Sequence, residues 1–287
     1  MNVYNVKADQ LIFTGDLHGN FDVLFFWLKN FAFKNTTLIV CGDIGFGFNK
    51  TEYYKQALKR INNFCVNSNS HIFFFRGNHD DPSYFNEDKL GFENIKTIPD
   101  YSIVQVETHE GIIHNVLCVG GGVSVDRTWR IKQDILNAGK YARFTGLTLK
   151  EAEKKLEHSY WEDELPSYNE AMLNEITDSG IKIDIMASHT CPSFVGFKDK
   201  DGVQGWLNND PYLEKDMNFE REVMDMISSK LKEEEHPLTN WVYGHFHQHM
   251  DEEIEGVRYT MLDMCRPEKS RLDTLEIRNG EMEDIFD

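Results

Sequence analysis

The sequence predicts an α/β fold in which short buried strands alternate with amphipathic helices. Three apolar runs near the N-terminus each end in glycine and a polar residue: 11–13 before Gly15-Asp16, 37–40 before Gly42-Asp43, and 71–75 before Gly77-Asn78. Helical patterns separate these runs. Strand and helix alternating in this way are typical of a largely buried sheet with helical crossovers.

The two intervening segments have the apolar spacing of helices that cover a sheet. Asn20 stands where a helix cap is expected. The first helix then carries Phe21, Leu24, Phe25 and Leu28, and the second carries Tyr54, Leu58, Ile61 and Cys65. Because these residues recur every three or four positions, each set forms one buried face.

The rest of the chain predicts further β-structure and one helical insertion. Residues 103–106 and 112–119 are expected to form a hairpin. The charged stretch from about 126 to 178 predicts an insertion with helices over 148–158 and 167–176. Later strands are expected at 182–187, 241–243, 258–262 and 274–277, with an acidic helix over about 212–235. Since no linker or repeat interrupts the chain, we expect a single domain over residues 1–287.

Composition and the N-terminal sequence indicate which partners and which compartment to expect. The chain has 30 Lys plus Arg against 48 Asp plus Glu, a net charge of −18. This charge argues against nucleic acid and anionic membranes as partners. The 5 cysteines include no C-x-x-C pair, which indicates a reducing compartment. The N-terminus lacks a secretory signal pattern. We therefore expect a cytoplasmic protein.

Metal-ligand residue types follow the predicted strands. In α/β sheets the carboxyl ends of the strands meet at one edge, where sites assemble. The candidate ligands that follow the strands offer imidazole, carboxylate and amide groups but no thiolate, which favours manganese, iron or zinc. These ligands are Asp16, His18, Asp43, Asn78, His189, His245 and His247. Seven ligands suffice for two ions if one carboxylate is shared, whereas a structural zinc site needs four.

Two neighbouring cations predict hydrolysis of a phosphoester. Such a pair can deprotonate a bridging water at neutral pH and neutralise charge on a phosphoryl group. Two divalent ions would also outweigh the acidic surface locally. A hydroxide between the ions is then expected to attack phosphorus.

The motifs resemble those of the calcineurin-like metallophosphoesterase superfamily. They are Gly15-Asp16-Leu17-His18-Gly19, Gly42-Asp43, Gly77-Asn78-His79-Asp80, Ser188-His189 and Gly244-His245-Phe246-His247. The resemblance implies a two-sheet β-sandwich flanked by helices. It also implies that Asp16, His18 and His247 bind one metal ion, that Asn78, His189 and His245 bind a second, and that Asp43 bridges them. By the same resemblance His79 is a catalytic residue over the scissile bond, where it stabilises phosphoryl transfer or protonates the leaving group.

Two features indicate the branch of the superfamily. Serine/threonine phosphatases carry Arg in a Gly-Asp-x-x-x-Arg-Gly pattern, whereas this chain continues Gly42-Asp43 with Ile44-Gly45-Phe46-Gly47-Phe48. The segments 120–130 and 161–164 are instead similar to small bacterial and phage phosphoesterases. The resemblance of these two segments to small bacterial and phage phosphoesterases does not identify a substrate.

The sequence leaves several functional questions open. Arg127 and Arg130 are candidate substrate-binding residues that can clamp phosphate oxygens, although ordinary salt bridges explain them equally well. Our prediction is a dinuclear metal-dependent phosphohydrolase acting on a small phosphomonoester or phosphodiester, with Mn, Fe or Zn and possible use of Ni. The alternatives are a non-catalytic scaffold for partner binding and a nuclease or cyclic-nucleotide phosphodiesterase. The sequence does not determine the oligomeric state.

Overall fold

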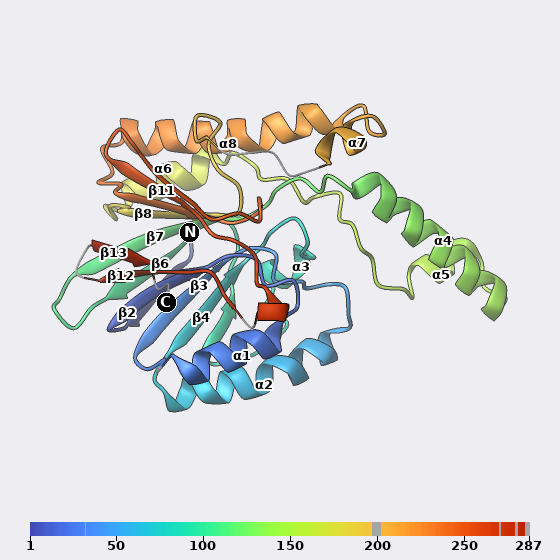
Figure 1. Cartoon of the computed structure of the whole chain (residues 1–287), viewed down its shortest axis with the longest axis horizontal. Coiled ribbons are helices and arrows are strands. Elements are labelled where there is room, and N and C mark those ends of the chain that lie inside the picture. Colours follow the sequence, from blue (N-terminus) through green and yellow to red (C-terminus); the bar gives the residue numbers. More distant parts are fainter. Residues whose placement is uncertain (32, 197–201, 270, 279–280, 285–287) are drawn as a thin grey trace.

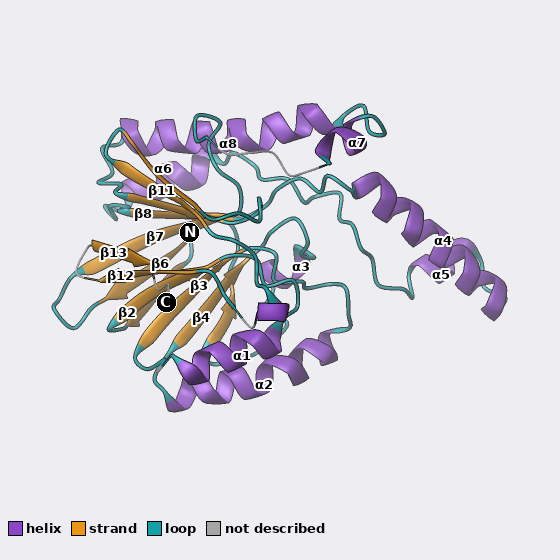
Figure 2. Ribbon diagram, viewed as in Figure 1, coloured by secondary structure: helices purple, strands orange, loops and turns teal. Residues whose placement is uncertain are grey.

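The chain folds into two facing β-sheets with helices on their outer sides (Figure 1). The computed structural model describes residues 1–287 except 32, 197–201, 270, 279–280 and 285–287. Figure 2 shows the strands gathered at the centre and the helices outside them. The predicted two-sheet sandwich is confirmed.

The first sheet has the order β13-β12-β2-β3-β4-β5. Strands β2, β3, β4 and β5 run parallel, so β2, β3 and β4 end at the same edge. The antiparallel β12 extends the sheet on the other side of β2. The bounds are β2 Gln10–Thr14, β3 Thr36–Cys41, β4 His71–Phe75, β5 Ile95–Thr97, β12 Thr274–Arg278 and β13 Glu281–Asp284. The three N-terminal strands expected from the sequence are thus confirmed.

The second sheet has the order β1-β6-β7-β8-β9-β11-β10. The expected hairpin forms between β6 and β7, and β7, β8 and β9 run parallel. The bounds are β1 Val3–Lys7, β6 Ser102–Glu107, β7 Ile113–Val119, β8 Ile185–Ser188, β9 Asn240–Tyr243, β10 Met250–Ile254 and β11 Val257–Met261. The strand expected over 182–187 therefore begins three residues later than the pattern indicates.

Alternating side chains divide the core into layers. In β3, Leu38 and Val40 pack against the helices α1 (Phe21–Asn30) and α2 (Thr51–Asn67), whereas Ile39 faces the other sheet. This follows from the two-residue period of a strand. Helices α6 (Glu170–Asp178) and α8 (Leu213–Glu233) cover the second sheet in the same way.

The stretch of about 126–178 that was expected as an insertion contains α4 (Arg127–Thr145), α5 (Leu149–Glu153) and α6, of which α6 packs on the second sheet. Helices α4 and α5 extend away from the two sheets (Figure 1). Short helices α3 (Ser83–Asn86) and α7 (Val203–Leu207) and a 3-10 turn at Pro267–Lys269 complete the fold. Within the described part of the chain, none of the helices combines the length and apolar character needed to cross a membrane.

Two local predictions are wrong. The helix expected over 148–158 ends at Glu153, because Ser159 turns back to donate hydrogen bonds from N and Oγ to Asp134 on α4. Asn20 occupies the N-cap position of α1, but its side chain accepts no hydrogen bond from a helical N–H group. Its Nδ2 instead donates to the carbonyl of Leu17, so Asn20 closes the loop before the helix.

Candidate metal centre

The predicted ligands follow strands of both sheets. Asp16 and His18 follow β2, Asp43 follows β3, and Asn78 follows β4. His189 comes directly after β8 of the second sheet, and His245 and His247 come after β9. These residues meet because the parallel strands of the two sheets end on the same side of the sandwich.

Four residues form a first ligand cluster. One ligand atom from each of Asp16, His18, Asp43 and His247 lies within 4.8 Å of the corresponding atoms of the others. Nε2 of His247 is 3.0 Å from Oδ2 of Asp16 and 3.2 Å from Nε2 of His18. These distances and atom types fit a bound divalent cation.

Three further residues gather on the other side of Asp43. Nε2 of His189 lies 2.9 Å from Oδ1 of Asn78 and 3.3 Å from Oδ1 of Asp43. The ring centroids of His189 and His245 are 4.8 Å apart. Oδ2 of Asp43 faces His18 at 3.9 Å. The two oxygens of Asp43 are therefore directed at two different groups of ligands.

His79 lies beside Asp43. Its backbone N–H donates to Oδ1 of Asp43 at 2.7 Å, and its Nδ1 lies 3.3 Å from Oδ2 of Asp43. The side chain is partly exposed, in contrast to the fully buried Asp43 and His189. His79 can therefore meet a substrate that approaches the cluster from solvent.

The motif glycines allow the ligand loops to approach one another. A Cβ atom at Gly77 would lie 2.1 Å from Oδ1 of Asp43, and one at Gly244 would lie 2.3 Å from Oδ1 of Asp16. The loops also hold His18, Asp43, His245 and His247 at φ values of 46°, 48°, 72° and 55°. Each such residue costs about 1–3 kcal/mol, and strain of this kind is typical of functional sites.

Electrostatics favours an ionised carboxylate at the centre. Burial would raise the pKa of Asp43, but the imidazoles of His189, His79 and His18 hold this pKa well below its ordinary range. Burial would lower the pKa of His189, but Asp43 raises it to about 9. Asp43 thus carries negative charge in a buried position, which a cation would compensate.

Asp80 supports this arrangement, although the sequence analysis assigned it no role. Its buried carboxylate accepts hydrogen bonds from the backbone N–H groups of Ile44, Gly45, Phe46 and Gly77. These bonds connect the loops that follow β3 and β4. The feature of the sequence that could have indicated this role is the position of Asp80 directly after His79.

The buried polar atoms of the first ligand cluster fit a bound cation. Oδ2 of Asp16 is buried and forms no hydrogen bond of normal geometry, and the ring nitrogens of His18 and His247 face each other. A buried carboxylate oxygen without a donor is costly unless a cation compensates it. The seven predicted residues therefore fit metal ions, while the role of each as a ligand stays a prediction.

The candidate phosphate-binding arginines lie at the start of α4 and are held by acidic residues. Nε of Arg127 donates to Asp210 and its Nη1 donates to Asp216, both at 2.6 Å. Nε of Arg130 donates to Asp126 at 2.7 Å. Their contact with a substrate stays a prediction.

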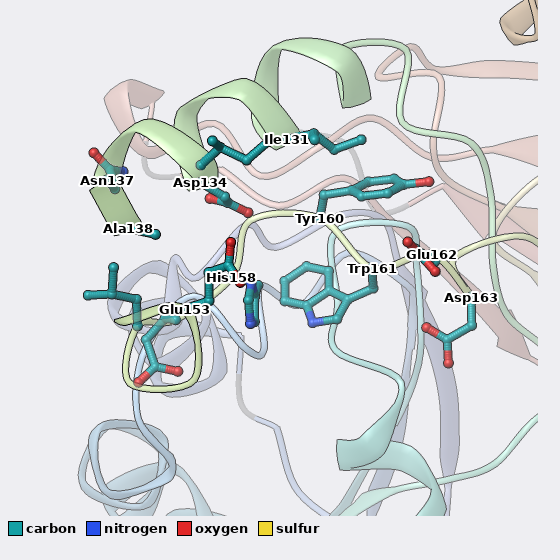
Figure 3. A pocket seen from close by; sticks show the side chains of 13 residues that line it. Ile131, Asp134, Asn137, Ala138, Glu153, His158, Tyr160, Trp161, Glu162 and Asp163 are labelled. Carbon is teal, nitrogen blue, oxygen red and sulfur yellow. The ribbon is translucent and has the colours of Figure 1, made fainter. Parts of the chain in front are cut away.

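A cavity of about 760 Å³ lies between α4 and the segment after α5. Figure 3 shows the rings of Tyr160 and Trp161 on this segment, with Ile131 and Asp134 on α4. The Trp161 ring packs edge-on against Phe48 with centroids 5.3 Å apart, and it lies against Gly47. Because Gly47 follows Asp43 by four residues, the cavity adjoins a loop of the metal centre.

The order and spacing of these residues match a known family. The sequence profile of calcineurin-like phosphoesterases matches residues 10–249, which include all seven ligand candidates and His79. The chain belongs to the calcineurin-like phosphoesterase family. The resemblance expected from the motifs is thereby confirmed, and a plausible Asp/His metal site accompanies it.

Two solved structures are similar to this calcineurin-like phosphoesterase over most of their length. The protein TT1561 of Thermus thermophilus is similar over 93% of this chain and 98% of its own, with a TM-score of 0.50 and 11% identity. A dimetal phosphatase from Danio rerio is similar over 95% of this chain and 94% of its own, with a TM-score of 0.49 and 13% identity. No curated protein sequence matches the chain.

Proposed function

We propose that this chain is a dinuclear metal-dependent phosphohydrolase that cleaves a small phosphomonoester or phosphodiester. The observation that carries the proposal is the position of Asp43. Its Oδ2 faces His18, and its Oδ1 faces His189. A carboxylate that faces two ligand groups is suited to bridge two cations.

Each group of side chains has a role in this proposal. Asp16, His18 and His247 would hold one cation, and Asn78, His189 and His245 would hold the other. The oxygen and nitrogen donors suit manganese, iron or zinc, with nickel as a further possibility. Two divalent cations bound there supply positive charge for the phosphoryl oxygens and acidity that deprotonates a water at neutral pH.

The protein side chains then orient the substrate and move protons. His79 would donate a proton to the alcohol oxygen as the bond between phosphorus and that oxygen breaks. Arg127 and Arg130 are the proposed phosphate contacts. The cavity beside Trp161 would receive the alcohol part of the ester on the apolar part of its lining, which includes Ile131, Tyr160 and Trp161. The lining also carries five carboxylates, which disfavour the phosphate group itself in this cavity: Asp134, Glu153, Glu157, Glu162 and Asp163.

The proposal is tested by hydrolysis of p-nitrophenyl phosphate and bis-(p-nitrophenyl) phosphate. The purified chain is stripped of metal and then assayed with manganese, iron, nickel and zinc in turn. We expect turnover that needs one of these ions, with a preference for one of the two esters. If no ion restores turnover on either ester, the scaffold alternative is favoured. Cleavage of a short oligonucleotide or a cyclic nucleotide in preference to both would favour the nuclease or phosphodiesterase alternative.

A further inference from the structure

A buried glutamate on α8 contacts the candidate metal centre from outside the five motifs. Glu220 is only 2% exposed, and its Oε1 lies 3.4 Å from Nε2 of His245. The buried face of α8 is otherwise apolar and includes Val223 and Ile227. Burying a carboxylate there is costly unless its partners compensate the lost hydration. The position of Glu220 therefore calls for an explanation.

Glu220 connects three segments near the second group of ligands. Its Oε2 accepts a hydrogen bond of 2.6 Å from the N–H of Val123, in the loop after β7. Its Oε1 is also 3.4 Å from Oγ1 of Thr190, which directly follows His189. The loop after β7 passes close to the histidines, because a Cβ atom at Gly122 would lie 3.1 Å from His189 and 3.2 Å from His245.

The contact with Glu220 determines which nitrogen of His245 can bind a cation. Since Nε2 faces the carboxylate, Nδ1 is the ring nitrogen directed away from Glu220 and would be the one that binds a metal ion. His189 is oriented in a similar way, because its Nδ1 contacts the carbonyl oxygen of Cys41 at 2.7 Å and its Nε2 faces Asn78. Partners of this kind fix the ring orientation of metal-binding histidines and increase their basicity.

Ser124 has the corresponding position behind Asn78. Nδ2 of Asn78 donates to Oγ of Ser124 at 2.9 Å, which directs Oδ1 of Asn78 toward His189. The N–H of Ser124 in turn donates to Oε1 of the buried carboxyl group of Glu164 at 2.9 Å. Consecutive residues of one loop, Val123 and Ser124, are thus each held by a buried glutamate.

We propose that Glu220 and Ser124 are positioning residues that selectively strengthen binding of the second cation, through His245 and Asn78 respectively. This inference rests on the dinuclear centre of the proposed function. The contacts of Glu220 and Ser124 given above reach His245 and Asn78, which both belong to the second group of ligands. The first cation should therefore bind independently of both.

The experiment measures Mn²⁺ bound per chain by equilibrium dialysis, using the full metal-free chain. We expect two Mn²⁺ sites in the wild type. In Glu220→Gln the amide oxygen can still accept from Val123, but the charge beside His245 is lost. The affinity of the second site for Mn²⁺ should fall about 10- to 100-fold, while the affinity of the first site is unchanged. Ser124→Ala should give the same pattern, and Glu222→Gln, an exposed position on the same helix, should behave as wild type.

Thermal unfolding of the metal-free variants checks that each is folded. If Glu220→Gln does not fold, the Mn²⁺ binding of Ser124→Ala tests the inference. Two Mn²⁺ sites of wild-type affinity in the folded variant would overturn the inference, as would equal weakening of both sites. A wild type that binds fewer than two ions would overturn the inference together with the dinuclear centre. A wild type that binds two ions but hydrolyses no ester would contradict only the proposed activity.

Discussion

Nε2 of His18 lies 3.2 Å from Nε2 of His247, although 229 residues separate them in the chain. His18 follows β2 of the first sheet, and His247 follows β9 of the second. The pair therefore forms only when the two sheets pack against each other. A cation held by both residues would connect the sheets, so metal binding and folding should be coupled.

We first predict that Mn²⁺ stabilises the chain against unfolding. A ligand that binds the folded state at 100 times its Kd adds about 2.7 kcal/mol for each site. Urea unfolding with and without saturating Mn²⁺ measures this gain, and excess chelator should reverse it. An unchanged midpoint in saturating Mn²⁺ would show that the cluster does not bind this ion in the folded chain.

The second prediction concerns Asp43→Asn. The amide keeps the shape of the side chain but removes the charge directed at both ligand groups. Turnover should fall by at least about 100-fold, because both cations lose their shared carboxylate. The stabilisation by Mn²⁺ should also decrease. Asp178→Asn, at an exposed position, is the matched control. Near-wild-type turnover of Asp43→Asn with metal present would refute the bridging role.

The third prediction separates catalysis from metal binding at His79. His79→Ala should lower kcat by about 10²- to 10⁴-fold, the range typical of a lost general acid. The number of Mn²⁺ ions bound should stay the same, because His79 belongs to neither group of ligands. Steady-state kinetics and equilibrium dialysis are measured on the same preparation, with the exposed His109→Ala as control. Loss of a bound ion in His79→Ala would instead assign His79 to the metal site.

Most of the fold was predictable because its strongest signals are local. The runs at β2, β3 and β4 are apolar and end at glycine, and Tyr54, Leu58, Ile61 and Cys65 all lie on the buried face of α2 as predicted. The early end of α5 was not predictable. It depends on Asp134, a residue of another helix that holds Ser159 by hydrogen bonds.

The gathering of the candidate ligand side chains was predictable for a similar reason, while their roles as ligands stay predictions. The ligand types stand directly after strands, so the order of elements brings them to one edge. Glu220 could not be found in this way. A charged residue on an amphipathic helix indicates the solvent-facing side, and only the packing of α8 near His245 shows that this one is buried.

The fourth prediction concerns the ion pairs of Arg127. Its guanidinium and the carboxylate of Asp210 are both largely buried. Removing one partner of a buried pair typically costs about 3–5 kcal/mol, since the other charge stays without compensation. Arg127→Met should therefore reduce the free energy of unfolding by about 3 kcal/mol. The exposed Arg143→Met, on the same helix, should change it by less than about 0.5 kcal/mol. A similar small effect of Arg127→Met would show that the pair adds little to stability.

The last prediction is a dependence of stability on pH that originates at Glu164. Burial, together with the nearby charge of Glu220, raises the pKa of Glu164 from 4.5 to about 8, although Ser124 and Arg127 act in the opposite direction. Below pH 4.5 the residue is protonated in both the folded and the unfolded chain. Between pH 4.5 and 8 the unfolded chain loses this proton while the folded chain keeps it, so the folded state binds more protons. The contribution of Glu164 to stability must therefore fall as pH rises through this window, and it should level off above about pH 8.

Glu164→Gln isolates this contribution, because glutamine has nearly the same shape and does not titrate. Urea unfolding of metal-free wild type and Glu164→Gln is compared at pH 5, 6, 7 and 8. The wild type should lose stability relative to the variant as pH rises, by up to about 1.4 kcal/mol for each pH unit. The difference between the two proteins cancels the titration of Asp43 and His189, which both retain. A difference that is constant over this range would mean that Glu164 titrates alike in the folded and unfolded chains, and that its carboxyl group is not kept protonated by burial.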